Sequence, residues 1–144
     1  MKYPHKPAAT ILADLVRLTP GDEGKWFAAA KEAKLFDEAI ALAEQTPCDP
    51  RTLTRAARDF AEKNPTFATE AGMAALYWLI RGHGYEITSS DVWAAWSNTM
   101  RAARNGGRDD EVRARIGALV DNAQPRGDFV AEIVRRCCAG QDPQ

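Results

Sequence analysis

Apolar residues recur along most of the chain at the three- and four-residue spacing of amphipathic helices. Leu53, Ala56 and Phe60 form one such stripe, and between Phe67 and Ile80 the apolar positions extend nearly all round the expected helix. A helix that is apolar on most sides is typical of a buried, central element. No segment shows a sustained two-residue alternation rich in β-branched residues, so no sheet is expected.

Cap residues and glycines mark the ends of these segments. Asp49-Pro50 and Asn64-Pro65 each combine an N-cap side chain with proline at the first helical position, and Thr88-Ser89-Ser90-Asp91 offers several caps. Glycines at 82, 84, 106, 107 and 140 predict helix stops. The marks together predict eight helices, at residues 7–18, 20–33, 36–46, 50–63, 65–81, 89–105, 108–122 and 126–138.

The connections between these helices are short, which makes sequential helices antiparallel neighbours. The predicted fold is therefore all-α, with about eight helices in stacked antiparallel hairpins, as an irregular α-solenoid or a bundle array. A length of 144 residues without a long linker predicts a single helical domain over 1–144, with loose termini at 1–6 and 140–144.

The N-terminal apolar run is interrupted by Asp14 and lacks a cleavage site, so no signal peptide is expected. No apolar stretch is long enough to span a membrane, so no membrane partner is expected. Three cysteines without a framework spacing favour a reducing compartment. These features predict a cytoplasmic protein, and its compactness suggests a bacterial one.

The overall charge is −1, which argues against a generic binder of nucleic acid or anionic membrane. One local exception is the arginine ridge, the set of Arg51, Arg55 and Arg58 at i, i+4 and i+7 on one helix face. Acids on a neighbour or phosphates can meet such a ridge, although Asp59 and Glu62 dilute it. Nucleic-acid binding through the ridge is therefore one alternative function.

Candidate chemistry is sparse. The chain has only two histidines, His5 and His83, and no C-x-x-C pair, so no metal site, cofactor or catalytic group is expected. His83 lies between glycines and close to Tyr85, where a histidine can bind or titrate. A small enzyme or ligand binder centred on the His83 loop is the second alternative. The simpler interpretation is that Gly82 ends a helix and leaves His83 exposed.

Aromatic residues gather on both sides of the longest break in the helical pattern. Trp93 and Trp96 lie three residues apart on the same face of one expected helix, and Trp78 and Tyr85 precede them. Such a cluster is usually core. Where part of it lines a groove instead, it is a natural anchor for a partner helix or peptide.

The stretch WFAAAKEAKLFDEAIALA, residues 26–43, resembles a tetratricopeptide-type helical hairpin. Phe36-Asp37-Glu38-Ala39 is similar to the aromatic-acidic-acidic-Ala start of that family's second helix, and Trp26 stands near its first-helix tryptophan. Lys34-Leu35 occupies the corner, where the family commonly has glycine. The resemblance implies a right-handed stack of helix pairs and a protein-binding role.

The leading hypothesis is a non-enzymatic, helical-repeat-like interaction module or scaffold that binds another protein or itself. The candidate partner-binding residues are taken from the arginine ridge, the His83 loop and the aromatic cluster. They are Arg51, Arg55, Arg58, His83, Tyr85, Trp93 and Trp96.

Overall fold

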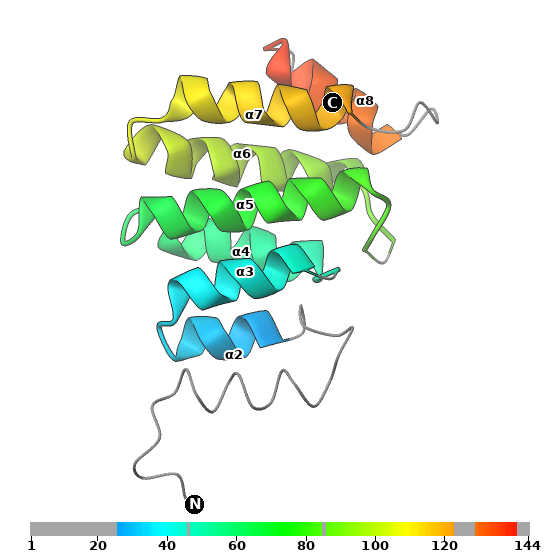
Figure 1. The fold of residues 1–144 in the computed structure, drawn as a ribbon. Helices are drawn as coiled ribbons and strands as arrows, with labels where there is room; N and C mark the ends of the chain where they lie inside the picture. Colours follow the sequence, from blue (N-terminus) through cyan, green and yellow to red (C-terminus); the bar gives the residue numbers. More distant parts are fainter. Residues whose placement is uncertain (1–25, 46, 85, 123–128, 141–144) are drawn as a thin grey trace, which may run out of the picture. The chain divides into compact units, whose positions relative to one another are not determined.

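The computed structural model of the chain describes residues 26–45, 47–84, 86–122 and 129–140 (Figure 1). Within these ranges it contains seven α-helices and no strand, which confirms the predicted all-α class. The predicted helix at 7–18, the start of the one at 20–33 and both chain ends (1–6 and 141–144) lie outside the described residues. The chain divides into two compact units, Met1–Cys48 and Asp49–Gln144, and the single-domain organisation stays a prediction.

In the first unit, α2 (Phe27–Glu32) and α3 (Phe36–Gln45) form a helical hairpin (Figure 1). Its corner is made by Lys34, whose φ of 62° lies in the left-handed region that favours glycine. The backbone N–H of the next residue, Leu35, donates to the carbonyl of Ala30 at 2.9 Å. This six-to-one bond is the helix-ending pattern in which glycine is most common, and here lysine adopts it.

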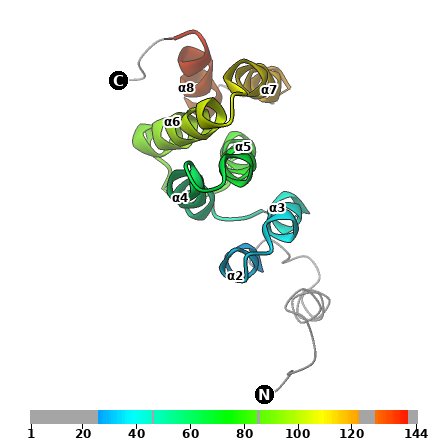
Figure 2. The same cartoon turned by 90° about the vertical axis from the view of Figure 1, so that its left-hand side faces the viewer.

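The second unit contains five helices, and Figure 2 looks nearly along the axes of α4 and α5. They are α4 (Pro50–Phe60), α5 (Pro65–Ile80), α6 (Ser89–Asn105), α7 (Asp109–Asp121) and α8 (Phe129–Cys138). α5 contacts the other four helices and is buried on nearly all sides, as its apolar pattern predicts. α6 packs against α4, α5, α7 and α8, so these two helices form the centre of the unit.

The predicted helix starts at 50, 65 and 89 are confirmed. The side chain of Asp49 accepts a hydrogen bond from the N–H of Arg51 at 3.0 Å, and that of Asn64 accepts one from the N–H of Phe67 at 3.2 Å. Each cap precedes a proline at the first helical position. At α6, a reciprocal capping box with Thr88 satisfies the exposed amides of the first turn.

A close approach between α5 and α6 depends on Gly72. A Cβ atom built on Gly72 would collide with the Thr99 hydroxyl and lie 2.9 Å from the Thr99 Cβ atom. Thr99 is fully buried, and its Oγ1 donates to the carbonyl of Ala95 at 2.6 Å, which holds the side chain in place. Glycine at this position therefore sets the separation of the two central helices.

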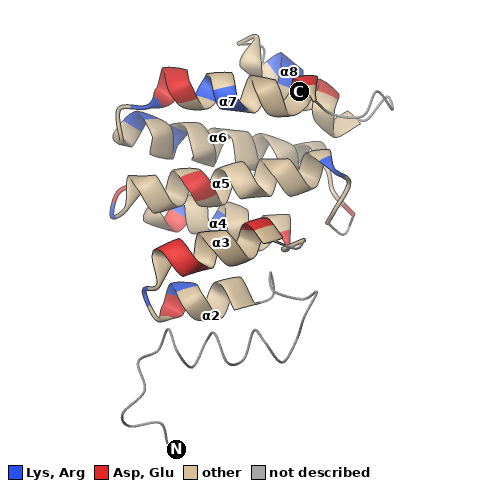
Figure 3. Ribbon diagram, in the orientation of Figure 1, with Lys and Arg blue, Asp and Glu red and all other residues tan. Residues whose placement is uncertain are grey.

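An ion-pair network joins α5 to the first half of α7. Both terminal nitrogens of Arg115 donate to the Glu70 carboxylate, at 2.8 and 2.9 Å, and Arg108 approaches the same group at 3.6 Å. Along α7, acids occupy the first turn and arginines follow (Figure 3). The hydrogen bonds from Arg115 hold the pKa of Glu70 below its ordinary value, because they favour the charged carboxylate more than partial burial disfavours it.

This shift predicts a contribution to stability that depends on pH. Because the pKa of Glu70 is lower in the folded state than in the unfolded chain, Glu70 contributes its full stabilisation above about pH 4.5, the ordinary value of its pKa. This stabilisation is lost as the pH falls through the lower pKa of the folded state. Glu70→Gln is expected to lower the free energy of unfolding at neutral pH by on the order of 1 kcal/mol, after allowance for solvent screening. Urea denaturation of both proteins should show this difference shrinking below about pH 4.5. A difference that stays constant with pH would contradict the assignment.

Candidate functional site

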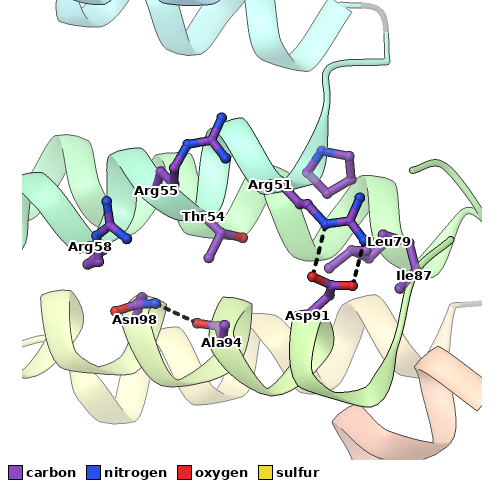
Figure 4. Close-up of a pocket in the computed structure, with 10 residues that line it drawn as sticks. Arg51, Thr54, Arg55, Arg58, Leu79, Ile87, Asp91, Ala94 and Asn98 are labelled. Atoms are coloured by element: carbon purple, nitrogen blue, oxygen red, sulfur yellow. Dashed lines mark hydrogen bonds and ion pairs between the residues drawn. The ribbon is translucent and has the colours of Figure 1, made fainter. Parts of the chain in front are cut away.

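A groove with a volume of about 280 Å³ lies between α4 and α6 in the second unit (Figure 4). Its ten lining residues come from α4, α6, the end of α5 and the segment that precedes α6. They are Pro50, Arg51, Thr54, Arg55, Arg58, Leu79, Ile87, Asp91, Ala94 and Asn98. The structure thus places the whole arginine ridge, one of the surfaces expected to bind a partner, along a single groove.

Arg51 spans the groove and is held at its far side. Its Nε donates to Asp91 Oδ1 at 3.0 Å and its Nη2 to Asp91 Oδ2 at 2.8 Å, a bidentate pair (Figure 4). The same Nη2 donates to the carbonyl of Glu86 at 3.1 Å. Arg51 therefore links α4 to the start of α6.

Asp91 has two roles at once. Besides binding Arg51, its Oδ2 accepts hydrogen bonds from the Thr88 N–H at 2.9 Å and from the Thr88 hydroxyl at 3.1 Å. The hydrogen bonds from Arg51 hold the pKa of Asp91 below its ordinary value, and those from Thr88 add to this effect. The carboxylate is therefore ionised at neutral pH and fixes one end of the groove.

Arg55 and Arg58 are differently placed. Arg55 donates at 3.4 Å to the hydroxyl of Thr52, one turn earlier on α4, and it has no acidic partner among the described residues. Arg58 pairs at 2.8 Å with Asp59, the next residue along, and both side chains are more than half exposed (55% and 52%). Figure 4 shows both arginine side chains extending away from α6. Their head groups therefore line the α4 rim of the groove without crossing it.

The end of the groove near Arg51 is apolar. Pro50 and Leu79 are buried there, and Ile87 packs beside them. Gly84, at a φ of 111°, brings the backbone so close that a Cβ atom would lie 2.6 Å from Ile87 Cδ1 and 3.4 Å from Pro50 Cγ. This close approach positions Ile87 at the groove.

The charge of the lining is unbalanced. Its three arginines and one aspartate give a formal charge of +2, on a chain whose total is −1. Arg51 and Asp91 neutralise each other, so the excess positive charge of the lining lies on Arg55 and Arg58, and Arg58 is paired with Asp59, which does not line the groove. Opposite Arg58 the groove has polar groups: the Asn98 amide nitrogen donates to the Ala94 carbonyl at 2.9 Å, which directs the side chain along its own helix.

His83 lies just after the end of α5 and is not among the residues that line the groove, although Ile87 of the same loop is. The His83 ring packs edge-on against Trp78, with centroids 5.1 Å apart and planes at 83°. The backbone N–H of His83 donates to the backbone carbonyl of Trp78 at 2.9 Å, and this hydrogen bond closes the end of α5. His83 is half-buried, whereas the simpler interpretation of the sequence leaves it exposed. Tyr85, its expected neighbour in a site, lies outside the described residues.

The two tryptophans of α6 occupy different environments. Trp96 is 7% exposed and has the guanidinium of Arg113 above its ring, 5.3 Å from the centroid. Trp93, one turn earlier, is 43% exposed. Neither residue lines the groove, so the structure does not bring Trp93 and Trp96 together with the arginine ridge.

The groove also contains residues that the sequence analysis did not select, mainly Asp91, Asn98 and Ile87. Asp91 was recognised only as part of a helix start. Its position three residues after the Thr88 cap was the available signal, because a third-position acid can reach both the cap and a neighbouring helix. Nothing in the local sequence around Asn98 or Ile87 indicates that they face α4.

Other possible chemistry is limited within the described ranges. There, no group of three or more His, Cys, Asp or Glu side chains is arranged to hold a metal ion. Cys48, Cys137 and Cys138 form no disulfide, and burial raises the pKa of the Cys138 thiol. None of the described helices has the length and apolar character needed to cross a membrane.

No protein-family model matches the chain, and neither the curated proteins nor the solved structures yield a significant match. The fold and the groove therefore define the protein only as a class: an all-α protein with a cationic groove between two helices. Any more specific function has to follow from the geometry of that groove.

Proposed function

We propose that the chain is a non-enzymatic helical interaction module that binds another protein in the groove between α4 and α6. The observation that carries this proposal is the combination of an apolar end with two arginine head groups on one rim. The groove volume of about 280 Å³ lies just below the range for pockets that enclose a whole ligand, roughly 300–1,000 Å³. Such a groove suits a few side chains presented by a protein surface.

The framework of the groove supports the same proposal. The Arg51–Asp91 pair, the capping box at Thr88 and the close approach of Gly84 to Ile87 and Pro50 all fix the walls of the groove before any partner arrives. A preformed surface loses less conformational entropy on binding than one that must be ordered. Partner recognition by helices commonly uses grooves of this kind.

The hairpin of the first unit adds a weaker line of support. Lys34 adopts the left-handed conformation at the corner where tetratricopeptide proteins commonly have glycine. A tetratricopeptide-like arrangement of helix pairs would suit a protein-binding role. A cytoplasmic location belongs to the proposal, and three cysteines without a disulfide agree with it.

The proposal is tested by cross-linking from inside the groove. A photoreactive amino acid at Thr54, a half-buried lining residue, is compared with the same amino acid at Ala118, an exposed position on α7. After irradiation in the native cells, a specific protein partner is expected to attach at Thr54 and not at Ala118. The partner is then purified so that its affinity can be measured.

A steric block completes the test. Thr54→Trp fills the groove and is expected to weaken binding of the purified partner at least about tenfold, while Ala118→Trp leaves it unchanged. Circular dichroism checks that both variants remain helical. If the partner binds Thr54→Trp as tightly as the original chain, the groove is not its docking site and the proposal is wrong.

A further inference from the structure

The groove has more definite chemistry than a general docking surface. Arg55 and Arg58 lie three residues apart on α4, which places their Cβ atoms about 5–6 Å apart on one helix face. Guanidinium groups bind carboxylates through paired, charge-assisted hydrogen bonds. Two carboxylates spaced by one helical turn, or by two residues of an extended chain, can therefore meet both arginines.

The present contacts of the two arginines leave room for such a ligand. Within the described part of the chain, Arg55 makes one hydrogen bond, at 3.4 Å, to the uncharged Thr52 hydroxyl. The Arg58–Asp59 pair joins adjacent, exposed side chains, and pairs of this kind contribute little net stability. A carboxylate of a partner can therefore bind these groups without breaking a strong internal contact, whereas Arg51 is held in place by Asp91.

The apolar end adds a second requirement. Leu79 and Ile87 lie at the Arg51 end of the groove, and Arg58 lies at the other end of the α4 wall (Figure 4). Pro50 directly precedes Arg51 at the start of α4. A ligand that follows α4 therefore meets an aliphatic surface and then positive charge. An aliphatic side chain next to acidic residues fits this order, because burying apolar surface is favourable only where the site itself is apolar.

We infer that the groove binds an acidic peptide segment of its partner, with carboxylates on Arg55 and Arg58 and an aliphatic side chain against Pro50, Leu79 and Ile87. This inference rests on the proposed function and specifies the partner's chemistry. A nucleic acid fits less well, since its phosphates need a longer cationic track and its bases need stacking platforms. None of the ten lining residues that the structure describes is aromatic, and the excess charge is only +2.

The test measures the fluorescence anisotropy of labelled probes as the full chain is added, at low and at moderate salt. The first probe is a short peptide of glutamates around one leucine. Its matched partner has glutamine for every glutamate, and a third probe is single-stranded DNA of similar length. The glutamate peptide is expected to bind at least about tenfold more tightly than the glutamine peptide, and more weakly as salt rises.

Variants locate the binding. Arg55→Ala/Arg58→Ala is expected to weaken binding of the glutamate peptide at least about tenfold. The matched control Arg104→Ala/Arg136→Ala removes two exposed arginines from α6 and α8 that do not line the groove, and should leave binding unchanged. Equal binding of the two peptides, tighter binding of the DNA, or equal effects of the two double variants would overturn the inference.

The result also separates this inference from the proposed function. If Thr54→Trp abolishes binding of the natural partner but Arg55→Ala/Arg58→Ala does not change it, the groove is a docking site and its ligand is not acidic. If Thr54→Trp leaves partner binding intact, the docking site itself is wrong. The two variants occupy the same helix, so a difference between them reports on the chemistry of the ligand.

Discussion

Gly72→Ala is expected to lower the free energy of unfolding of the second unit by about 2–3 kcal/mol, although alanine favours helices over glycine. The added methyl group would overlap the hydroxyl of Thr99 and approach its Cβ atom to 2.9 Å. Thr99 cannot move aside easily, because it is fully buried and β-branched, and it donates to the carbonyl of Ala95. The overlap can therefore be relieved only when α5 and α6 move apart, and this movement loosens the packing at the centre of the unit.

Gly117→Ala is the matched control for this prediction. Gly117 lies inside α7, and a Cβ atom there would meet no other atom within 4 Å. The same substitution should then raise stability by about 0.5–1 kcal/mol, through helix propensity alone. Chemical denaturation of both variants gives the comparison, and stabilisation by Gly72→Ala would show that α5 and α6 are not in close contact.

Coupling between the two helices can be measured directly. Adding Thr99→Ala to Gly72→Ala removes the closest overlap, that with the hydroxyl, but leaves the contact with the Cβ atom. The double variant should therefore be more stable than the sum of the two single effects predicts, since residues in direct contact are not additive. Simple additivity would place the cause of the destabilisation elsewhere.

Asp91→Ala is expected to lower the free energy of unfolding by about 2 kcal/mol, the combined cost of losing the Asp91 half of the capping box and a charge-assisted pair. The Asp91 carboxylate accepts from the Thr88 N–H and hydroxyl, and it binds Arg51 from 40 residues earlier in the chain. Without it, Arg51 loses its partner across the groove, and the first turn of α6 loses half of its capping box. Urea denaturation followed by circular dichroism measures the effect.

Glu62→Ala serves as the control, because it also breaks an ion pair between two elements. Its carboxylate is 3.1 Å from Arg101, but the Glu62 side chain is 79% exposed and caps no helix. Solvent screening should limit its effect to about 0.5 kcal/mol. If Asp91→Ala destabilises the protein no more than Glu62→Ala does, then Asp91 does not hold α4 to α6.

The helices were predictable because their signals are local. The caps at Asp49 and Asn64 lie directly before prolines, and the apolar spacing continues between them and the next break. Helix ends were less certain: α4 ends at Phe60, earlier than the predicted 63. The end of α4 also depends on a residue far along the chain, because the side-chain amide of Asn105 on α6 donates to the Ala61 carbonyl at 2.7 Å.

The candidate site was only partly predictable. The arginine ridge follows from helical spacing. The sequence does not show, however, that Arg51 is paired with Asp91 while Arg55 and Arg58 are not. That difference depends on a contact between residues 40 positions apart. Trp93 and Trp96 show the same limit, since their shared helix face did not reveal that one would be exposed and the other buried.

The packing role of Gly72 in α5 could not be predicted from the local sequence either. The glycines at 82, 84, 106, 107 and 140 predict helix stops, and Gly106 is indeed a helix cap, but no local pattern assigns a role to Gly72, a buried residue in the middle of α5. Its role depends on which residue of the neighbouring helix faces it. Only the packing of α5 on α6 identifies that residue as Thr99.

A protein partner is proposed to dock between α4 and α6. The most direct measurement is an amide nitrogen–proton NMR titration of the isotopically labelled full chain with the partner recovered by cross-linking at Thr54. The largest shifts are predicted at α4 from Arg51 to Arg58 and at α6 from Asp91 to Asn98. Shifts concentrated on α7 and α8, with the α4 and α6 amides unchanged, would contradict the account.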